Sequence, residues 1–302
     1  MKTKTFKIKS KSDGLLLDTS MFIPANPKAI VIFSHGMAEH KERYFDFMQY
    51  LTEHQYLTII HDHRGHGFSI KNENDLGYFY DETADYIVED LHDVYLNIKN
   101  VYSNLPVYLF SHSMGTLVAR KYLKKYDDTL DKLVLCGAPC DNRLKKLALV
   151  LAKTIKTIKG NHYRSPLINR LVFANADELF EGELKNRWLS KNQDNVQKYN
   201  DDPLCGFTFT TNGFINLFQL LIDTFDENHW ILHKTELPIL MIAGQNDPII
   251  GSSEKWYQTK TFLNNLGYQN IENILYPNLR HEILNESNNQ KVYQDILNFF
   301  DK

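Results

Sequence analysis

Short apolar runs that recur along the chain constrain its fold more than any other feature. Residues 29–33, 57–60, 107–110, 133–136 and 239–243 form five such runs, and residues 271–276 form a weaker sixth. Uninterrupted runs rich in β-branched residues are typical of strands buried on both faces, as in parallel sheets. Helix-length amphipathic stretches lie between several runs, at residues 44–54, 83–101 and 114–126. This alternation predicts βαβ units with right-handed crossovers, and therefore an α/β fold.

The alternation is interrupted once, between residues 141 and 233. Helical or loop patterns dominate there, at 144–158, 176–190 and 212–224. An insertion between two strands of a parallel sheet predicts a lid over the carboxyl edge of the sheet, where ligands bind. The predicted domains are an α/β core of residues 1–140 and 234–302 and a helical lid of residues 141–233. The Lys-rich N-terminal segment predicts an edge strand.

The composition excludes several classes of protein. The 302 residues carry a formal net charge of -3, without the basic stripe of a nucleic-acid-binding protein. No stretch approaches the ~18 apolar residues of a membrane helix, and the first twenty residues lack a signal-peptide pattern. The three cysteines cannot form a fully paired disulfide framework and lack metal-ligand spacing, which favours a reducing, cytoplasmic compartment. We expect no metal and no cofactor.

A candidate nucleophile follows the apolar run at 107–110. The sequence Ser111-His112-Ser113-Met114-Gly115 leads into a helix and is close to G-x-S-x-G, the nucleophile elbow, with Ser111 in place of the first glycine. An elbow would bring Ser113 Oγ to the carboxyl edge of the sheet and leave the Met114 N–H at a helix N-terminus. Taken alone, the motif fits an ordinary strand–helix junction with two capping serines equally well.

A base and an orienting acid appear in the order that this architecture requires, serine, then acid, then histidine. Asp247 follows the run at 239–243, and His281 follows the run at 271–276. We therefore predict a catalytic triad of Ser113, Asp247 and His281. The histidine takes the serine proton during attack on a carbonyl and returns it to the leaving group, while the aspartate fixes the imidazole tautomer.

The developing oxyanion needs two donors. Met37 lies on the loop that leaves the run at 29–33, and we predict that its N–H acts beside the Met114 N–H. Each such donor is typically worth ~3 kcal/mol to the transition state.

Four segments carry a family resemblance. They are HGMAEH at 35–40, DHRGHGFS at 62–69, SHSMG at 111–115 and RHEILNE at 280–286. In this order they resemble the α/β-hydrolases of the monoacylglycerol lipase and lysophospholipase group, and the resemblance covers essentially the whole chain. It implies an α/β-hydrolase fold, a lid over an acyl-binding pocket and serine hydrolysis of small acyl esters. The family usually has glycine where Ser111 stands. The lid has little that matches the family, so the resemblance implies neither a particular substrate nor particular substrate-binding residues.

Two further groups have competing interpretations. Residues 61–66, HDHRGH, resemble the opening of a binuclear zinc site, but Gly65 stands where such a site needs aspartate. We therefore predict a structural loop. Glu39, His40 and Arg43, just after the oxyanion loop, are also expected to be structural.

The function predicted from these observations is that of a cytoplasmic serine carboxylic-ester hydrolase acting on monoacylglycerol, lysophospholipid or similar short-to-medium acyl esters. One alternative is an aminopeptidase similar to proline iminopeptidases, whose lid would grip a free amine through Glu178, Glu181 or Glu183. A non-catalytic ligand-binding protein of this fold is the other. Apolar lid residues could line the acyl pocket or contact a lipid surface transiently, although most are expected to pack in the interior.

Overall fold

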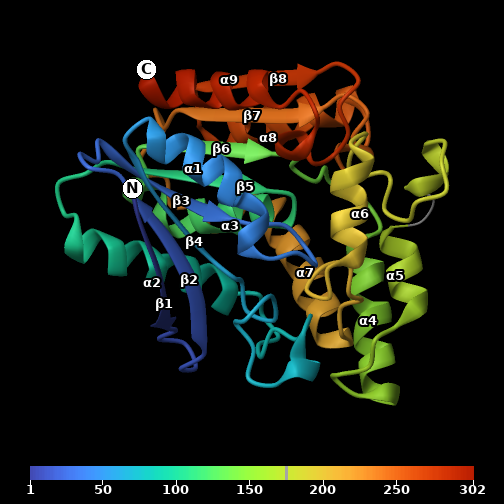
Figure 1. Ribbon diagram of the computed structural model, residues 1–302. Helices are drawn as coiled ribbons and strands as arrows, with labels where there is room; N and C mark the ends of the chain where they lie inside the picture. The colour runs from blue at the N-terminus through green and yellow to red at the C-terminus, as the bar shows by residue number, and fades with distance from the viewer. Residues whose placement is uncertain (174–175) are drawn as a thin grey trace.

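An eight-stranded sheet with the order β1-β2-β4-β3-β5-β6-β7-β8 forms the centre of the computed structural model, which describes residues 1–173 and 176–302 (Figure 1). The first two strands are antiparallel to their neighbours, and the others run parallel. The strands are β1 (Lys2–Lys9), β2 (Leu16–Ile23), β3 (Ala29–Ser34), β4 (Tyr56–His61), β5 (Val107–His112), β6 (Lys132–Cys136), β7 (Ile239–Gly244) and β8 (Ile271–Tyr276).

All six apolar runs form parallel strands, and β1 is the predicted edge strand. Strand β2 was not predicted from the sequence. Its centre carries Asp18, Thr19 and Ser20, so it lacks both an apolar run and a clean alternation. These polar side chains are nevertheless buried, because β2 lies between β1 and β4. Tertiary pairing therefore overrides a weak local preference here.

Helices cover both faces of the sheet. The apolar sides of α1 and α9 contribute to the core on one face, and those of α2, α3 and α8 to the core on the other. These helices are α1 (Phe45–Glu53), α2 (Tyr86–Val101), α3 (Met114–Tyr126), α8 (Ser253–Leu266) and α9 (Gln290–Asp301). Short 3-10 turns are η1 (Lys41–Tyr44), η2 (Glu73–Asp75), η3 (Asp127–Thr129), η4 (Asp177–Leu179), η5 (Pro248–Ile250) and η6 (Ile283–Asn285). No helix in the described part of the chain is long and apolar enough to cross a bilayer.

The segment between β6 and β7 is helical and lies beside the carboxyl ends of the parallel strands, on the right in Figure 1. Its helices are α4 (Lys145–Lys159), α5 (Pro166–Val172), α6 (Gln193–Asp201) and α7 (Thr211–Thr224). Helix α7 contacts α4 within this segment, and it also contacts α3, which packs on the sheet. Its side chains also hold a core loop, since Asn212 Oδ1 accepts from the Phe79 N–H at 2.8 Å and Asn216 Oδ1 from the Ala84 N–H at 3.0 Å.

The sequence left helix and loop both open for the segment at 176–190, and the segment is a loop in which only the short turn η4 forms. The Asp177 carboxylate accepts hydrogen bonds from the N–H groups of Asn186 at 2.9 Å and Trp188 at 3.2 Å, which folds the segment back on itself. Gly182, at φ +117°, provides a bend that no helix contains. An aspartate that bonds backbone N–H groups ahead of it competes with the helical ladder.

The strand register aligns the segments that carry the predicted site. Ser34 of β3 pairs with Ser111 of β5, and Gly244 of β7 pairs with Tyr276 of β8. The loops that leave these strands at their carboxyl ends carry Met37, Ser113, Asp247 and His281. Side chains from opposite ends of the chain therefore meet at one edge of the sheet.

Candidate active site

Ser113 occupies a strained turn between β5 and α3. Its backbone has φ +51° and ψ −119°, a region that non-glycine residues rarely adopt and that typically costs about 1–3 kcal/mol. Hydrogen bonds on both sides hold the turn. The Ser113 N–H donates to Cys136 O on β6 at 2.9 Å, and Thr116 donates to Ser113 O through its N–H at 2.9 Å and its hydroxyl at 2.7 Å.

Small residues around the turn permit this geometry. A Cβ on Gly115 would overlap the carbonyl oxygen of Ser34, so the helix approaches β3 only because this residue is glycine. A Cβ on Gly36 would lie 3.2 Å from Ser113 Cβ, which places the predicted oxyanion loop, the loop with Gly36 and Met37 that leaves β3, against the serine. Ser111 is fully buried, and its hydroxyl donates to Val134 O of the neighbouring strand at 2.8 Å. Serine therefore fits at the position of the usual glycine, because its buried hydroxyl is hydrogen-bonded.

His281 and Asp247 form a buried pair beyond the ends of β8 and β7. Nδ1 of His281 lies 2.8 Å from Oδ2 of Asp247, and Oδ1 of Asp247 accepts from the Ile249 N–H at 2.8 Å. A carboxylate at Nδ1 keeps the proton on that nitrogen and leaves Nε2 available as a base. The contacts of the described residues include no hydrogen bond between Nε2 and Ser113 Oγ. Such bonds are often long before substrate binds.

Gly137, which the sequence analysis did not single out, makes room for this pair. It has φ +59°, and a Cβ there would lie 3.1 Å from His281 Cε1 and 3.3 Å from Asp247 Oδ2. The backbone after β6 therefore passes directly against both side chains. A glycine directly after a buried strand was the available sequence signal, but it did not indicate which groups approach it.

The two predicted oxyanion donors are free. Within the described chain, neither the Met37 N–H nor the Met114 N–H has an acceptor. Directly after Met37, Ala38 adopts φ +52°, and its carbonyl accepts from the Tyr199 hydroxyl at 3.0 Å and the Gly206 N–H at 2.8 Å. Two donors from the segment between β6 and β7 thus hold the oxyanion loop in its strained conformation.

A buried charge cluster lies behind this loop. Glu39 accepts from the Gly36 N–H at 2.5 Å, the Tyr44 hydroxyl at 2.7 Å and Arg43 Nε at 3.2 Å, and Nδ1 of His112 lies 3.4 Å away. Burial alone would raise the pKa of Glu39, but the hydrogen bond and charge of His112 and the charge of Arg43 lower it well below its usual range. Burial alone would lower the pKa of His112, but the hydrogen bond and the charge of Glu39 raise it above its usual value.

The same cluster reaches the segment of the candidate base, His281, which extends the structural role expected for Glu39 and Arg43. Arg43 donates to Glu282, the residue after His281, at 2.5 Å. The Trp188 ring packs against the His281 ring with centroids 5.1 Å apart. Neither residue was predicted from the sequence, because Glu282 had no assigned role within the segment at 280–286 and Trp188 lies in no motif.

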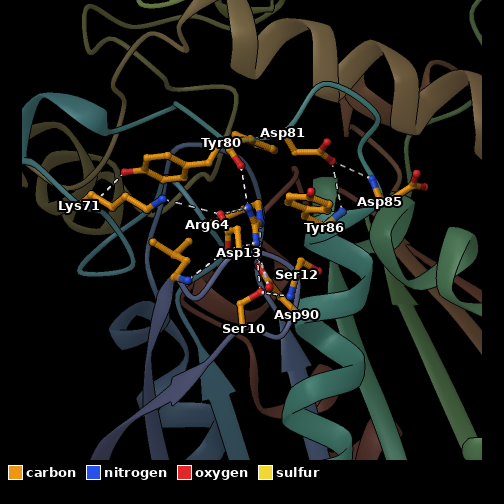
Figure 2. Close-up of polar contacts among 12 residues, drawn as sticks. Ser10, Ser12, Asp13, Arg64, Lys71, Tyr80, Asp81, Asp85, Tyr86 and Asp90 are labelled. Atoms are coloured by element: carbon orange, nitrogen blue, oxygen red, sulfur yellow. Dashed lines mark hydrogen bonds and ion pairs between the residues drawn. The ribbon is translucent and has the colours of Figure 1, made fainter.

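The segment at 61–66 is a structural loop, as expected. Arg64 is fully buried and donates to both oxygens of Asp90, at 2.8 and 3.0 Å, and to Asp13 (Figure 2). Asp62 accepts from Lys41 through its N–H at 2.8 Å and its Nζ at 3.0 Å. The histidines of this loop form no metal-binding group among the residues that the structure describes.

Known proteins with similar sequences and folds support the resemblance. The chain is 29% identical to the monoglyceride lipase homolog of Monkeypox virus over 76% of its length and 75% of that protein. It is 28% identical to the human monoglyceride lipase over 80% of its length and 73% of that protein. The crystal structure of a highly thermostable carboxyl esterase from Bacillus coagulans, 24% identical, superposes with a TM-score of 0.90 over 100% of this chain and 98% of that one.

The predicted fold and family group are confirmed. The eight-stranded, mostly parallel sheet with helices on both faces is the α/β-hydrolase fold, in agreement with the esterase structure. A family profile described as serine aminopeptidase, S33, matches residues 25–288, the greater part of the sequence. The chain therefore belongs to the S33 serine aminopeptidase family of α/β-hydrolases.

Proposed function

We propose that this protein is a serine carboxylic-ester hydrolase that uses Ser113, His281 and Asp247. The observation that carries the proposal is the buried 2.8 Å contact between His281 Nδ1 and Asp247 Oδ2, at the sheet edge where Ser113 occupies its strained turn. A carboxylate-oriented imidazole at the same edge as a serine hydroxyl is the arrangement that activates serine for acyl transfer. The activities named for the relatives, monoglyceride lipase and carboxyl esterase, agree with it.

The reaction proceeds in two steps. Nε2 of His281 takes the proton of Ser113 as its oxygen attacks the ester carbonyl, and the oxyanion accepts from the Met37 and Met114 N–H groups. The protonated imidazole then gives its proton to the leaving alcohol, and an acyl-enzyme remains. Water attacks this ester in the same way and releases the acid. Asp247 stabilises the imidazolium in both steps.

The substrate class that we propose is a small acyl ester such as a monoacylglycerol or a lysophospholipid. The aminopeptidase alternative needs acidic groups that grip a free amine in the site, but Glu178, Glu181 and Glu183 are all exposed. A buried amine would require a buried partner. The binding-protein alternative gives no reason for the His281–Asp247 pair.

We further propose that residues 141–233 act as the lid and touch a lipid surface transiently. Helices α4 and α5, with the residue that precedes α4, carry large apolar side chains that are at least half exposed, namely Leu144, Leu147, Val150, Ile158, Leu167 and Leu171. Lysines such as Lys146 and Lys153 lie exposed on α4. Apolar patches with lysines around them suit anionic bilayers. Flotation with phosphatidylglycerol vesicles tests this, and equal recovery of wild type and a Leu147→Ser/Val150→Ser variant would contradict it.

The three free cysteines support the cytoplasmic setting proposed for the enzyme.

The decisive experiment measures p-nitrophenol release from esters ranging from acetate to palmitate. We expect turnover in the wild type, and loss of at least about a thousandfold in Ser113→Ala with unchanged thermal stability. Cys140→Ser, whose side chain has no hydrogen bond to the pair in the described structure, is the control and should retain wild-type turnover. Full activity in Ser113→Ala would refute the assignment, and activity on aminoacyl amides alone would favour the aminopeptidase. The chain length that is hydrolysed fastest reports the depth of the acyl pocket.

A further inference from the structure

Three side chains with different donor atoms meet beside the oxyanion loop. His40, Asp202 and Cys205 each offer one ligand atom, and these atoms lie within 4.8 Å of one another. Nε2 of His40 is 2.9 Å from Oδ2 of Asp202. In the described ranges, no other group of His, Cys, Asp or Glu side chains is arranged to hold a metal ion in this way. Cysteine spacing did not reveal the cluster, because His40 and Asp202 are 162 residues apart.

The backbone after α6 presents two of the three ligands. The Cys205 N–H donates to Asp202 O at 3.0 Å, which forms a turn that brings both side chains together. The Leu204 N–H donates to Oδ1 of Asp202 at 2.8 Å, so this carboxylate is held through one oxygen and offers the other to His40. Cys205 is a free thiol. The site is thus built before any ion arrives, apart from a small inward movement of the ligands.

The donor set determines which ion would fit. An imidazole nitrogen, a carboxylate oxygen and a thiolate sulfur together suit Zn²⁺ or Co²⁺, whereas Mg²⁺ and Ca²⁺ prefer oxygen alone. Zinc bonds of ~2.0–2.3 Å place neighbouring ligand atoms of a tetrahedron about 3.3–3.8 Å apart. The His40–Asp202 contact would open by roughly half an ångström, and the thiol would move inward by at most about 1 Å. The Asp202 side chain is 30% exposed, so an ion can enter and water can complete the coordination.

The charges near the cluster tolerate a cation. The carboxylate and a thiolate neutralise a divalent ion between them. Arg43, the nearby cation, is already paired with Glu39 and Glu282. His40 is held through Nε2 alone, since its buried Nδ1 has no hydrogen-bond partner in the part of the chain that the structure describes, so its ring can adjust to a metal.

We propose that His40, Asp202 and Cys205 bind a zinc-class divalent ion that fastens the lid to the oxyanion loop. Two of the ligands belong to the segment whose Tyr199 and Gly206 already bond Ala38 O, and the third lies just beyond Met37 on the core loop. Binding forms a metal–sulfur bond and releases the thiol proton to solvent. The ion takes no part in the chemistry of Ser113, and the proposal does not depend on the ester reaction. Its consequence is slower turnover, because the metal restrains lid and loop together.

The test is a Co²⁺ titration of the purified, metal-free protein followed by absorbance. We expect one equivalent to produce the thiolate-to-cobalt charge-transfer band and the visible bands of tetrahedral cobalt, and Zn²⁺ to abolish both. Cys205→Ser should lose the charge-transfer band, and Asp202→Asn, which keeps the acceptor for the Leu204 N–H, should bind about tenfold or more weakly. Cys140→Ser is the matched control and should retain the full spectrum. Zn²⁺ should raise the melting temperature of the wild type but not of Cys205→Ser.

Two spectral outcomes would overturn the proposal. One is the absence of a thiolate band in the wild type, and the other is unchanged cobalt affinity in Cys205→Ser. If zinc inhibits Cys205→Ser as strongly as the wild type, the inhibitory ion binds elsewhere, and the inferred restraint of the lid is overturned. The spectra need no turnover, and Ser113→Ala should retain the cobalt site, so failure here is distinguishable from failure of the proposed esterase.

Discussion

Acidification should unfold this protein well before its carboxylates are protonated. Four histidines, His35, His61, His63 and His66, lie fully buried near the oxyanion loop. Burial lowers the pKa of His35 to about 4 and the pKa values of His61 and His66 to about 3, and it also lowers the pKa of His63 well below 6.5. Their rings also lie close together, with His35 and His63 centroids 4.4 Å apart, so a charge on one opposes a charge on the next.

The sign and size of the effect follow from linkage. Each folded-state pKa is depressed, so between about pH 6.5 and 4 the unfolded chain binds protons that the folded chain does not. The stabilisation is present above the unfolded-state pKa of about 6.5 and is lost as pH falls. For one such histidine, the free energy of unfolding falls by about 2 kcal/mol between about pH 7.5 and 5. For all four it falls by about 8 kcal/mol, a large part of the ~5–15 kcal/mol that holds a typical protein folded.

Urea denaturation at a series of pH values measures this loss directly. The free energy of unfolding should fall by about 5 kcal/mol per pH unit near pH 5, which corresponds to about four protons. His61→Leu removes one titrating ring without breaking a hydrogen bond, because neither ring nitrogen of His61 has a partner among the described residues. This slope should then decrease by about 1.4 kcal/mol per pH unit. His233→Leu, at an exposed position, is the control and should keep the wild-type slope. A wild-type slope that corresponds to the uptake of fewer than about two protons on unfolding would refute the reasoning.

Three further substitutions, one of them with a control, test individual buried contacts. Gly137→Ala puts a Cβ against the His281–Asp247 pair at φ +59°, so ester turnover should fall at least about tenfold while KM changes little; unaltered kcat would contradict the tight approach. Arg64→Met leaves Asp90 buried without its bidentate partner and should reduce the free energy of unfolding by about 3–5 kcal/mol in urea titrations. Lys71→Met is its control, because the Lys71 side chain is 48% exposed, and an equal loss in both variants would count against the buried pair. Ser111→Gly removes a buried hydrogen bond and should cost about 1–2 kcal/mol with esterase activity retained; a loss of activity instead would make the hydroxyl part of the elbow's function.

Local sequence was sufficient for the parallel sheet and for the order of the candidate catalytic groups. Strands buried on both faces require continuous apolar side chains, and such runs are visible without any tertiary information. Because parallel strands all present their carboxyl ends at one edge, residues that directly follow them converge there. Ser113, Asp247 and His281 could therefore be grouped from their positions after three runs.

Other features depend on partners that are remote in sequence. Strand β2 forms because β1 and β4 lie on either side of it, and its polar centre gives no local indication. The segment at 176–190 is a loop because one carboxylate, that of Asp177, captures two backbone N–H groups. Burial and hydrogen bonding in the folded molecule determine these local structures, and the periodicity of the sequence does not indicate them.

The surroundings of the site were decided by the tertiary structure in the same way. Trp188 packs on His281, Tyr199 and Gly206 bond Ala38, and Gly137 leaves room for the His281–Asp247 pair. Nothing in the sequence indicated the role of these four residues. The position of a candidate reacting group just after a strand can be predicted from a few neighbouring residues. The groups that orient it, shield it and restrain its loop come from segments far away along the chain, and only folding brings them within contact distance.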